Sequence, residues 1–345
     1  MIGSGGSPLP TPAASSPGAS TSHAAPLLSV SNLRIEFPTR HGTLRAVHDI
    51  SFDIAPGEIL GVVGESGAGK SLTGAAIIGL IDPPGRIAGG QIHLGGRRID
   101  NLPYEAMRRV RGREIGAVFQ DPLTSLNPLY TIGRQLVETI QTHLPLAVPA
   151  ARARAISLLE EVGIPAAARR VDHYPHQFSG GMRQRVVIAL ALAGSPRLIV
   201  ADEPTTALDV SIQAQIIQLL KRLCGDHGTA VMLITHDMGV IAETADRVAV
   251  MYAGRIVEIG PVAEVIHRPA HPYTVGLMGS IPSIVADRPR LMQIDGVMPR
   301  LNAIPAGCAF HPRCAIAIDR CRHDRPELLD VGATRAACWL APAAQ

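Results

Sequence analysis

The chain has 345 residues, more than a single domain usually needs, so we expect more than one structural unit. Hydrophobic residues make up 46% and charged residues 18% of the sequence, which supplies a sizeable core and excludes a mostly disordered chain. The formal net charge of only +3 argues against a strongly electrostatic nucleic-acid-binding protein. No apolar run approaches the roughly 20 residues that a membrane-spanning helix requires.

The first ordered elements are predicted after a leader. Residues 1–26 are rich in Ser, Pro, Ala and Gly and lack a basic start and an apolar centre, so they predict a disordered leader and no signal peptide. Leu33–Phe37 and Ile50–Ile54 alternate polar and apolar residues, as half-buried strands do. Ile59–Val63 is continuously apolar, which is typical of a strand buried on both faces, and a helix is predicted over Leu72–Leu80.

The second half of the chain repeats this strand and helix pattern. Arg197–Ala201 and Ala230–Thr235 predict two more buried strands, and the helix between them has an apolar face from Ile212 to Leu223. Gly225 is the expected end of that helix. Such units predict an α/β domain with a largely parallel sheet. We expect this domain to span 27–268, with an inserted helical part at about 122–190 and a Pro- and Cys-rich extension over 269–345.

A phosphate-binding loop is predicted between the buried strand and the helix. The segment fits the pattern G-x-x-x-x-G-K-[ST], in which glycines let the backbone wrap phosphates and the helix N-terminus adds positive charge. A glycine-rich turn matching by chance is the alternative, and the flanking strand and helix argue against it. Lys70 is expected to reach the β- and γ-phosphates, and the Ser71 hydroxyl to ligate Mg²⁺. The predicted nucleotide-binding residues here are Gly64, Glu65, Ser66, Gly67, Ala68, Gly69, Lys70, Ser71 and Leu72.

Two carboxylates follow the strand at 197–201. Asp202 suits a Mg²⁺ contact, and Glu203 can orient or deprotonate the attacking water. An acidic pair at a strand end is common surface chemistry, and the phosphate loop is what makes this pair informative. Together the two motifs predict a Mg²⁺-dependent nucleotide hydrolase.

Residues 178–185 (FSGGMRQR) resemble the signature motif of the ATP-binding-cassette (ABC) ATPases, which begins Leu-Ser-Gly-Gly-Gln. Phe178 and Met182 depart from that pattern, and Met182 lacks the amide with which Gln would contact a ribose. Ser179, Gly180 and Gly181 precede a helix and predict a second phosphate-binding N-terminus. In the family this segment closes over the ATP that the other subunit holds.

Further residues stand in the order that the family requires. The resemblance implies that Gln120 senses Mg²⁺ and the water and links to the membrane domain, and that His236 contacts the γ-phosphate. It makes Ala207–Asp209 a loop at the dimer interface, with Asp209 near the nucleotide. The catalytic candidates are therefore Lys70, Gln120, Glu203 and His236, and the Mg²⁺ candidates are Ser71, Gln120 and Asp202.

The aromatic residue that stacks on adenine in this family is expected near 37–42. Both Phe37 and His41 stand in that stretch, and the sequence does not choose between them. His41 is kept as the cofactor-binding candidate.

Several segments are similar to the peptide-importer branch of the family: 119–128 (FQDPLTSLNP), 174–177 (YPHQ), 201–210 (ADEPTTALDV) and 271–274 (HPYT). The resemblance implies an ATP-binding subunit of a dipeptide or oligopeptide importer. The implied fold is a P-loop NTPase cassette with a mixed sheet, an antiparallel β subdomain, an inserted helical subdomain and a Cys-rich extension.

The same resemblance implies partners and a location. The partners are a second, paralogous ATPase subunit, two transmembrane permease subunits and an extracytoplasmic solute-binding protein, with no nucleic acid. The chain would lie peripherally on the cytoplasmic face of the membrane. An importer ATPase for nickel or another solute is the alternative, followed by a soluble ABC ATPase of DNA repair or translation. The single cassette, the lack of a heptad run and the low net charge argue against the last class.

Four cysteines crowd the tail: Cys308, Cys314, Cys321 and Cys338. Four thiolates suit Zn²⁺ or an iron–sulfur cluster, but the spacing lacks the C-x-x-C pairs common in zinc ribbons and leaves free or packing cysteines open. Some importers that resemble this chain carry a [4Fe–4S] cluster at this tail, and this likeness places an iron–sulfur cluster first.

Overall fold

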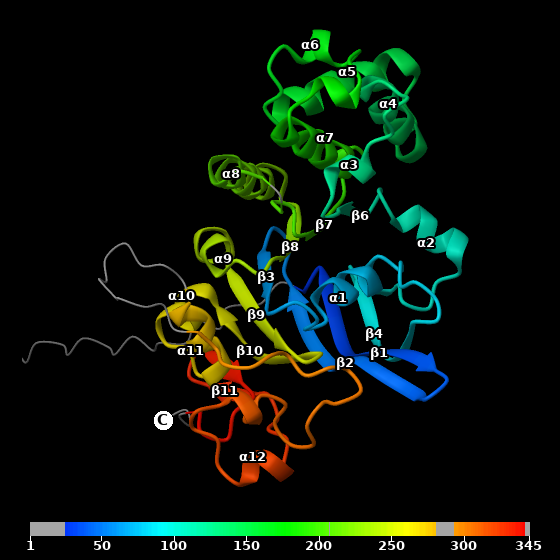
Figure 1. Cartoon of the computed structure of the whole chain (residues 1–345). Coiled ribbons are helices and arrows are strands. Elements are labelled where there is room, and N and C mark those ends of the chain that lie inside the picture. Colours follow the sequence, from blue (N-terminus) through cyan, green and yellow to red (C-terminus); the bar gives the residue numbers. More distant parts are fainter. Residues whose placement is uncertain (1–24, 207, 281–292, 342–345) are drawn as a thin grey trace, which may run out of the picture.

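The computed structural model describes residues 25–206, 208–280 and 293–341. Two sheets form its frame, one of four antiparallel strands and one of eight mixed strands (Figure 1). The predicted leader lies outside the described residues except for positions 25 and 26. No helix in the described ranges is long and apolar enough to cross a membrane.

The four-stranded sheet has the strand order β2-β1-β4-β5, with every neighbouring pair antiparallel. Its half-buried pattern follows from alternation, because Leu33 and Ile35 face the core while Arg34 lies at the edge of it. The two strands predicted from alternation are confirmed as parts of longer ones. The strands are β1 (Leu28–Thr39), β2 (Gly42–Ile54), β4 (Arg86–Leu94) and β5 (Arg97–Arg98).

The eight-stranded sheet has the order β11-β12-β10-β9-β3-β8-β7-β6. The five strands from β9 to β6 pair in parallel, which confirms the largely parallel sheet. The remaining pairs are antiparallel. The strands are β3 (Ile59–Val63), β6 (Ile115–Val118), β7 (Leu198–Asp202), β8 (Ala230–Ile234), β9 (Arg247–Tyr252), β10 (Arg255–Pro261), β11 (Leu329–Val331) and β12 (Thr334–Ala336).

The continuously apolar strands are explained by two cores, one on each face of the large sheet. Along β3, Ile59 and Val63 belong to the core shared with the inserted helices, and Leu60 and Val62 belong to the core shared with β1 and β2. Successive side chains of a strand point to opposite faces, so a strand covered on both sides has no polar position left.

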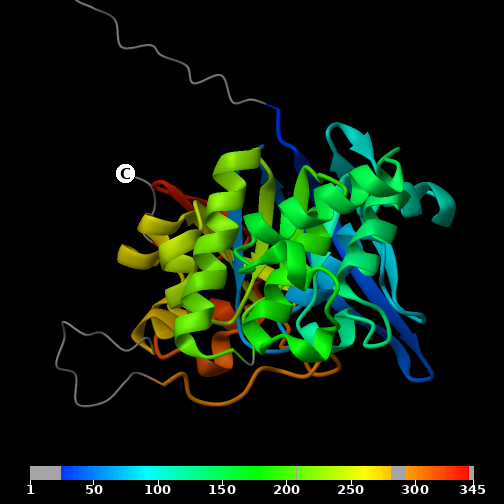
Figure 2. The ribbon, with the colours of Figure 1, turned by 90° about the horizontal axis from the view of Figure 1, so that it is seen from above.

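The helical insertion predicted at about 122–190 contains most of the helices between β6 and β7. It stands at the top of Figure 1, and Figure 2 looks down on it. Its amphipathic faces bury Leu136, Ile140 and Leu158 fully, in the core that the insertion shares with one face of the large sheet. The helices are α3 (Pro122–Ser125), α4 (Ile132–His143), α5 (Val148–Glu161), α6 (Ala167–Arg170), a 3₁₀ turn at Pro175–Gln177, and α7 (Gly180–Leu192).

One predicted helix end is wrong. Helix α8 (Val210–His227) runs through Gly225 and ends at Gly228, which has φ +63° and takes the left-handed cap position. A glycine inside a helix costs only about 1 kcal/mol relative to alanine, which the buried side chains of Leu223 and Cys224 offset. The cap needs a positive φ, so it falls at the later glycine.

The remaining helices flank the sheets and the tail. The tail's two short strands join the cassette's own large sheet, because Glu258 and Ile259 of β10 pair with β12. Three-residue strands are too short to give a readable alternation, so the sequence did not predict them. The helices are α1 (Lys70–Ile77), α2 (Tyr104–Val110), α9 (Met238–Thr244), α10 (Val262–His267), α11 (Pro272–Gly279), a 3₁₀ turn at His311–Arg313, and α12 (Arg320–His323).

Candidate nucleotide-binding site

The loop between β3 and α1 has the backbone that a phosphate cradle requires. Gly64, Gly67 and Gly69 have φ values of +149°, +82° and +100°, a region that side chains rarely enter. A Cβ at Gly64 would lie 2.2 Å from the carbonyl oxygen of Met251, so the loop also packs too tightly for a larger residue. The loop ends at the first residue of α1, whose free N–H groups face the same side.

Lys70 is buried beneath this loop. Its Nζ donates to the carbonyl oxygens of Gly64 at 2.8 Å and Glu65 at 3.1 Å. Burial lowers the pKa of Lys70, and the nearby carboxylates of Glu203, Asp202 and Glu65 act against that shift. The ammonium is therefore held at the loop, where it can meet phosphate oxygens.

Ser71 and Asp202 come together from α1 and β7, as the Mg²⁺ prediction requires. The Ser71 hydroxyl donates to Asp202 Oδ1 at 3.0 Å. Burial raises the pKa of Asp202 and outweighs the hydrogen bond from Ser71, with Glu203 adding repulsion. A hydroxyl and a carboxylate are oxygen donors of the kind Mg²⁺ prefers, and the ion's charge would compensate the buried carboxylate.

Glu203 is the centre of a polar cluster. Gln120 Nε2 and the Thr206 hydroxyl donate to its Oε2 at 3.0 and 2.9 Å, and His236 Nδ1 lies 3.3 Å from Oε1. The backbone of Glu203 has φ +46°, a strained value that functional sites often hold. Thr206 was not predicted, because a threonine three residues after the acidic pair has no signal of its own.

The protonation state of Glu203 follows from these contacts. Partial burial acts to raise its pKa, but the hydrogen bonds of Thr206 and His236 outweigh burial, and the net shift is downward. Glu203 is therefore a carboxylate at neutral pH. A carboxylate with a lowered pKa is a weak base, but the hydrogen bonds hold its oxygens in fixed directions. Glu203 is therefore better suited to orient a water molecule than to deprotonate it.

The signature segment lies on a different part of the molecule. Ser179 is the N-cap of α7 and its Oγ accepts from the N–H of Met182 at 3.4 Å. A Cβ at Gly181 would lie 2.6 Å from Ile212 Cγ2, so this glycine lets α7 approach α8. Among the described residues, no hydrogen bond or ion pair joins 179–181 to the phosphate loop.

The predicted contacts with adenine and with a second subunit involve residues at the edge of the site. His41 lies exposed in the turn between β1 and β2, and its N–H donates to Thr39 Oγ1 at 3.2 Å. Phe37 lines a cavity of about 310 Å³ together with Ser71 and Leu72. Asp209 is exposed at the start of α8, whereas Ala207 lies outside the described residues. The adenine and interface contacts remain predictions.

Two residues of the tail reach the phosphate loop, and sequence reasoning missed both. The Glu65 N–H donates to the Tyr273 hydroxyl at 2.8 Å, and Arg313 Nη1 donates to Glu65 Oε2 at 3.0 Å. Tyr273 packs edge-on against Tyr252 at 4.7 Å between ring centroids. The HPYT segment was noticed only as a family likeness, and Arg313 carried no signal.

The four tail cysteines line one narrow cavity of about 10 Å³, roughly the space of one water molecule. Burial raises the pKa of the Cys308, Cys314 and Cys338 thiols, which are protonated near neutral pH. In the part of the chain that the structure describes, no group of three or more His, Cys, Asp or Glu side chains is close enough to hold a metal ion.

The glycine loop with its lysine, the Ser71–Asp202 pair and the Glu203 cluster define a P-loop nucleotide hydrolase. A family model described as ABC transporter matches residues 47–206, and one described as oligopeptide/dipeptide transporter, C-terminal region, matches 257–321. The chain belongs to the ABC transporter ATP-binding protein family and is an ATPase of that type. ATP and Mg²⁺ are the nucleotide and ion expected at its site.

Individual relatives agree with this assignment. The putative peptide import ATP-binding protein of Brucella abortus (strain 2308) is 48% identical over 91% of this chain and 95% of its own length. The dipeptide transport ATP-binding protein DppD of Escherichia coli (strain K12) is 47% identical over 88% and 92%. A solved dimeric ATP-binding cassette in a post-hydrolysis state, bound to ADP and Pi, matches 68% of this chain and 98% of its own, with a TM-score of 0.61 at 28% identity.

Proposed function

We propose that this chain hydrolyses ATP to power the import of dipeptides or oligopeptides across the cytoplasmic membrane. The observation that carries the proposal is the presence, on one chain, of a complete phosphate site and of the C-terminal region typical of oligopeptide and dipeptide transporters. Relatives named for peptide import match more than nine-tenths of their own length, which supports the same substrate class.

The catalytic unit is a pair of cassettes that enclose two ATP molecules head to tail. Each site takes its phosphate loop, Asp202 and Glu203 from one chain and Ser179–Gly181 from the other. The capped N-terminus of α7 supports this arrangement, because it can bind phosphate yet makes no bond to its own loop within the described residues. A dimeric solved relative supports it too. ATP favours the closed pair because it contacts both faces, and hydrolysis releases it.

Within each site the chain's own groups have separate tasks. Lys70 and the loop N–H groups bind the β- and γ-phosphates, and Ser71 and Asp202 would hold Mg²⁺, which neutralises charge on the phosphates. Glu203 orients the attacking water, and Gln120 and His236 keep its carboxylate in place. His236 is mostly exposed on its other side and is free to meet the γ-phosphate.

The motion is passed to partner subunits. We propose a second, paralogous ATPase, two transmembrane permeases and an extracytoplasmic solute-binding protein, with this chain peripheral on the cytoplasmic face of the membrane. Gln120 supports a coupling role, because it touches Glu203 and stands directly before the inserted helices. A change at the γ-phosphate can therefore reach the insertion through one hydrogen bond.

We also propose that the tail holds a [4Fe–4S] cluster in the assembled protein. The four thiols have the chemistry for it and line one cavity, but they are not spaced as a metal group in this conformation, so binding would draw them together and release their protons. Anaerobic reconstitution with iron and sulfide should give four irons per chain and visible absorbance, both lost in Cys314→Ser. Unchanged iron content in that variant would refute the site.

The central test is Glu203→Gln. The variant should bind ATP, abolish its hydrolysis and accumulate ATP-bound pairs, read by phosphate release and size-exclusion chromatography. Wild-type turnover would refute the role of Glu203. Uptake of a labelled dipeptide by cells carrying the transporter, compared with uptake of nickel, tests the substrate class. Copurification with permeases supports transport, whereas copurification with ribosomes or DNA would overturn it.

A further inference from the structure

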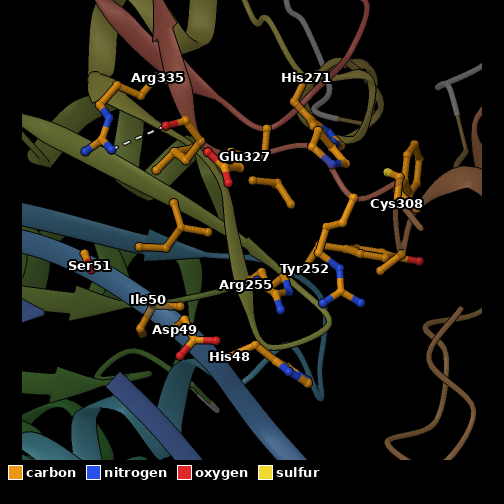
Figure 3. Close-up of a pocket in the computed structure, with 18 of the residues that line it drawn as sticks. His48, Asp49, Ile50, Ser51, Tyr252, Arg255, His271, Cys308, Glu327 and Arg335 are labelled. Atoms are coloured by element: carbon orange, nitrogen blue, oxygen red, sulfur yellow. Dashed lines mark hydrogen bonds between the residues drawn. The ribbon is translucent and has the colours of Figure 1, made fainter. Parts of the chain in front are cut away.

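A second cavity, of about 490 Å³, lies away from the phosphate loop (Figure 3). It opens between β2, β10 and the tail, and its lining includes no residue of the loop at 64–71 and neither Asp202 nor Glu203. A volume of this size is typical of sites for small organic molecules. The ATPase mechanism makes no use of this cavity.

Arg255 on β10 is the unusual residue of this cavity. Its guanidinium is half-buried, and among the described residues it has neither a hydrogen-bond nor an ion-pair partner. The carboxylate that acts on Arg255, that of Asp49, is already bound to Arg34 through hydrogen bonds of 2.6 and 3.1 Å. A half-buried charge without a partner raises the free energy of the folded protein unless an anion joins it.

Other basic groups surround the same space. Arg325 and Arg335 line it. Among the described residues, their side chains donate hydrogen bonds only to backbone carbonyls, at 3.4 Å, and Asp330 lies 3.6 Å from Arg335. His48 adds a buried Nε2 that has no hydrogen-bond partner in the described part of the chain. Figure 3 shows His48 and Arg255 on the same side of the cavity.

The electrostatics confirm that positive charge is concentrated here. Burial and then the neighbouring Arg325 lower the pKa of Arg255 to about 10, and burial and then Arg255 lower that of His48 to about 4. The burial part of each shift disfavours a charge of either sign. The part that comes from neighbouring arginines shows that positive charge is gathered here, and that part favours a negative charge.

The lining also has an apolar part beside its polar residues, which include Asp49 and Glu327. Ile50, Ile256 and the rings of Tyr252 and Phe310 contribute to it, so a ligand can bury carbon as well as charge. A bare inorganic ion would leave most of the volume unused. Glu327 at the rim is exposed and has no partner within the described residues, and its carboxylate opposes any anion.

We propose that this cavity binds a small organic anion through a carboxylate or phosphate group held by Arg255. The planar guanidinium can donate two parallel hydrogen bonds to two oxygens of a carboxylate or of a phosphate. His48, as a neutral imidazole, can donate a further hydrogen bond from its Nε2–H. Arg325 lies close enough to share the charge, and the apolar wall receives the remainder of the molecule.

The test uses the full chain with a non-hydrolysable ATP analogue and Mg²⁺ in excess, so that phosphate cannot enter the nucleotide site. Titration calorimetry with inorganic phosphate and with succinate at constant ionic strength separates the two headgroups. At least one should bind, and Arg255→Gln should weaken it about ten-fold or more. Glu327→Gln should strengthen it, because a like charge is removed. Arg169→Gln, at an exposed arginine of α6 outside the cavity, should change nothing.

The melting temperature of the protein tests the proposal independently. Without added anions, Arg255→Gln should melt at the wild-type temperature or above it, because an uncompensated charge is lost. Adding the bound anion should stabilise the wild type and not the variant. Failure of both probes to bind, or equal binding by Arg255→Gln and Arg169→Gln, would overturn the proposal. So would a lower melting temperature of anion-free Arg255→Gln, which would make the arginine structural.

Discussion

Replacing Arg313 by methionine keeps the apolar stem and removes the guanidinium that joins the tail to the phosphate loop. In the wild type, Nη1 donates to Glu65 Oε2 at 3.0 Å and Nε donates to the carbonyl oxygen of Asp295 at 2.8 Å. The Arg313 side chain is only 8% exposed, and that of Glu65 is 29% exposed. The variant therefore leaves a carboxylate and a carbonyl without their partner at a largely buried place.

The magnitude follows from that geometry. A fully buried pair that loses one member costs about 3–5 kcal/mol, and a single charge-assisted hydrogen bond contributes about 1.5–3 kcal/mol. Since water reaches the Glu65 carboxylate, we expect a loss of about 2–3 kcal/mol of unfolding free energy. Because Glu65 lies inside the phosphate loop, the KM for ATP should rise by several-fold while kcat changes less.

Urea unfolding and steady-state ATPase kinetics check both expectations. Arg322→Met is the matched control, because Arg322 is an exposed arginine of the same tail, in helix α12. Glu65→Gln and the double variant complete a cycle that isolates the pair from general effects on the tail. If Arg313→Met and Arg322→Met had the same stability and the same KM, the bridge would have no role in the loop.

Three further outcomes are expected. Gly225→Ala should stabilise the protein by about 0.5–1 kcal/mol in urea unfolding, because its Cβ meets open space inside α8, whereas Gly228→Ala should destabilise it at φ +63°. Burial lowers the pKa of His271 to about 4, whereas the unfolded chain keeps the ordinary value of about 6.5. The free energy of unfolding should therefore be highest above pH 6.5 and should fall by up to about 3 kcal/mol as the pH drops towards 4. His271→Asn should make the free energy of unfolding, measured in urea, less dependent on pH over that range. Thr206→Val should raise the pKa of Glu203 and move the acid limb of the ATPase pH profile upward, and an unchanged profile would contradict the role of this hydrogen bond.

The phosphate site could be predicted because its chemistry is local in sequence. Gly64–Ser71 is one uninterrupted loop, and the strand, glycines and helix that it needs are all adjacent. Glu203 and His236 could be placed because parallel strands bring their ends to one edge of a sheet, which is where β7 and β8 put them. At these positions the order of the motifs along the chain was sufficient to predict the site.

The contacts of the tail could not be predicted for the opposite reason. Arg313 and Glu65 are 248 positions apart, and Tyr273 and Glu65 are 208 apart, with no periodicity between them. The sequence around Arg255 is typical of an ordinary strand arginine. Only the three-dimensional arrangement shows that Asp49 is bound to Arg34 and that, within the described ranges, Arg255 has no hydrogen-bond or ion-pair partner. Pairings of this kind depend on how whole elements pack, and single-residue patterns do not contain that information.

The described part of the tail contacts the phosphate loop through a short series of packed residues. It adds β11 and β12 to the cassette's sheet, and its Phe310 packs against Tyr252 and Tyr273, at centroid distances of 5.2 and 5.4 Å. Tyr273 and Arg313 then hold the backbone and the side chain of Glu65. Cys308 is two residues before Phe310 and lines both the cysteine cavity and the cavity of Arg255. A ligand in either cavity would contact residues of this aromatic cluster or their neighbours, so we expect the affinity for ATP to change when one binds.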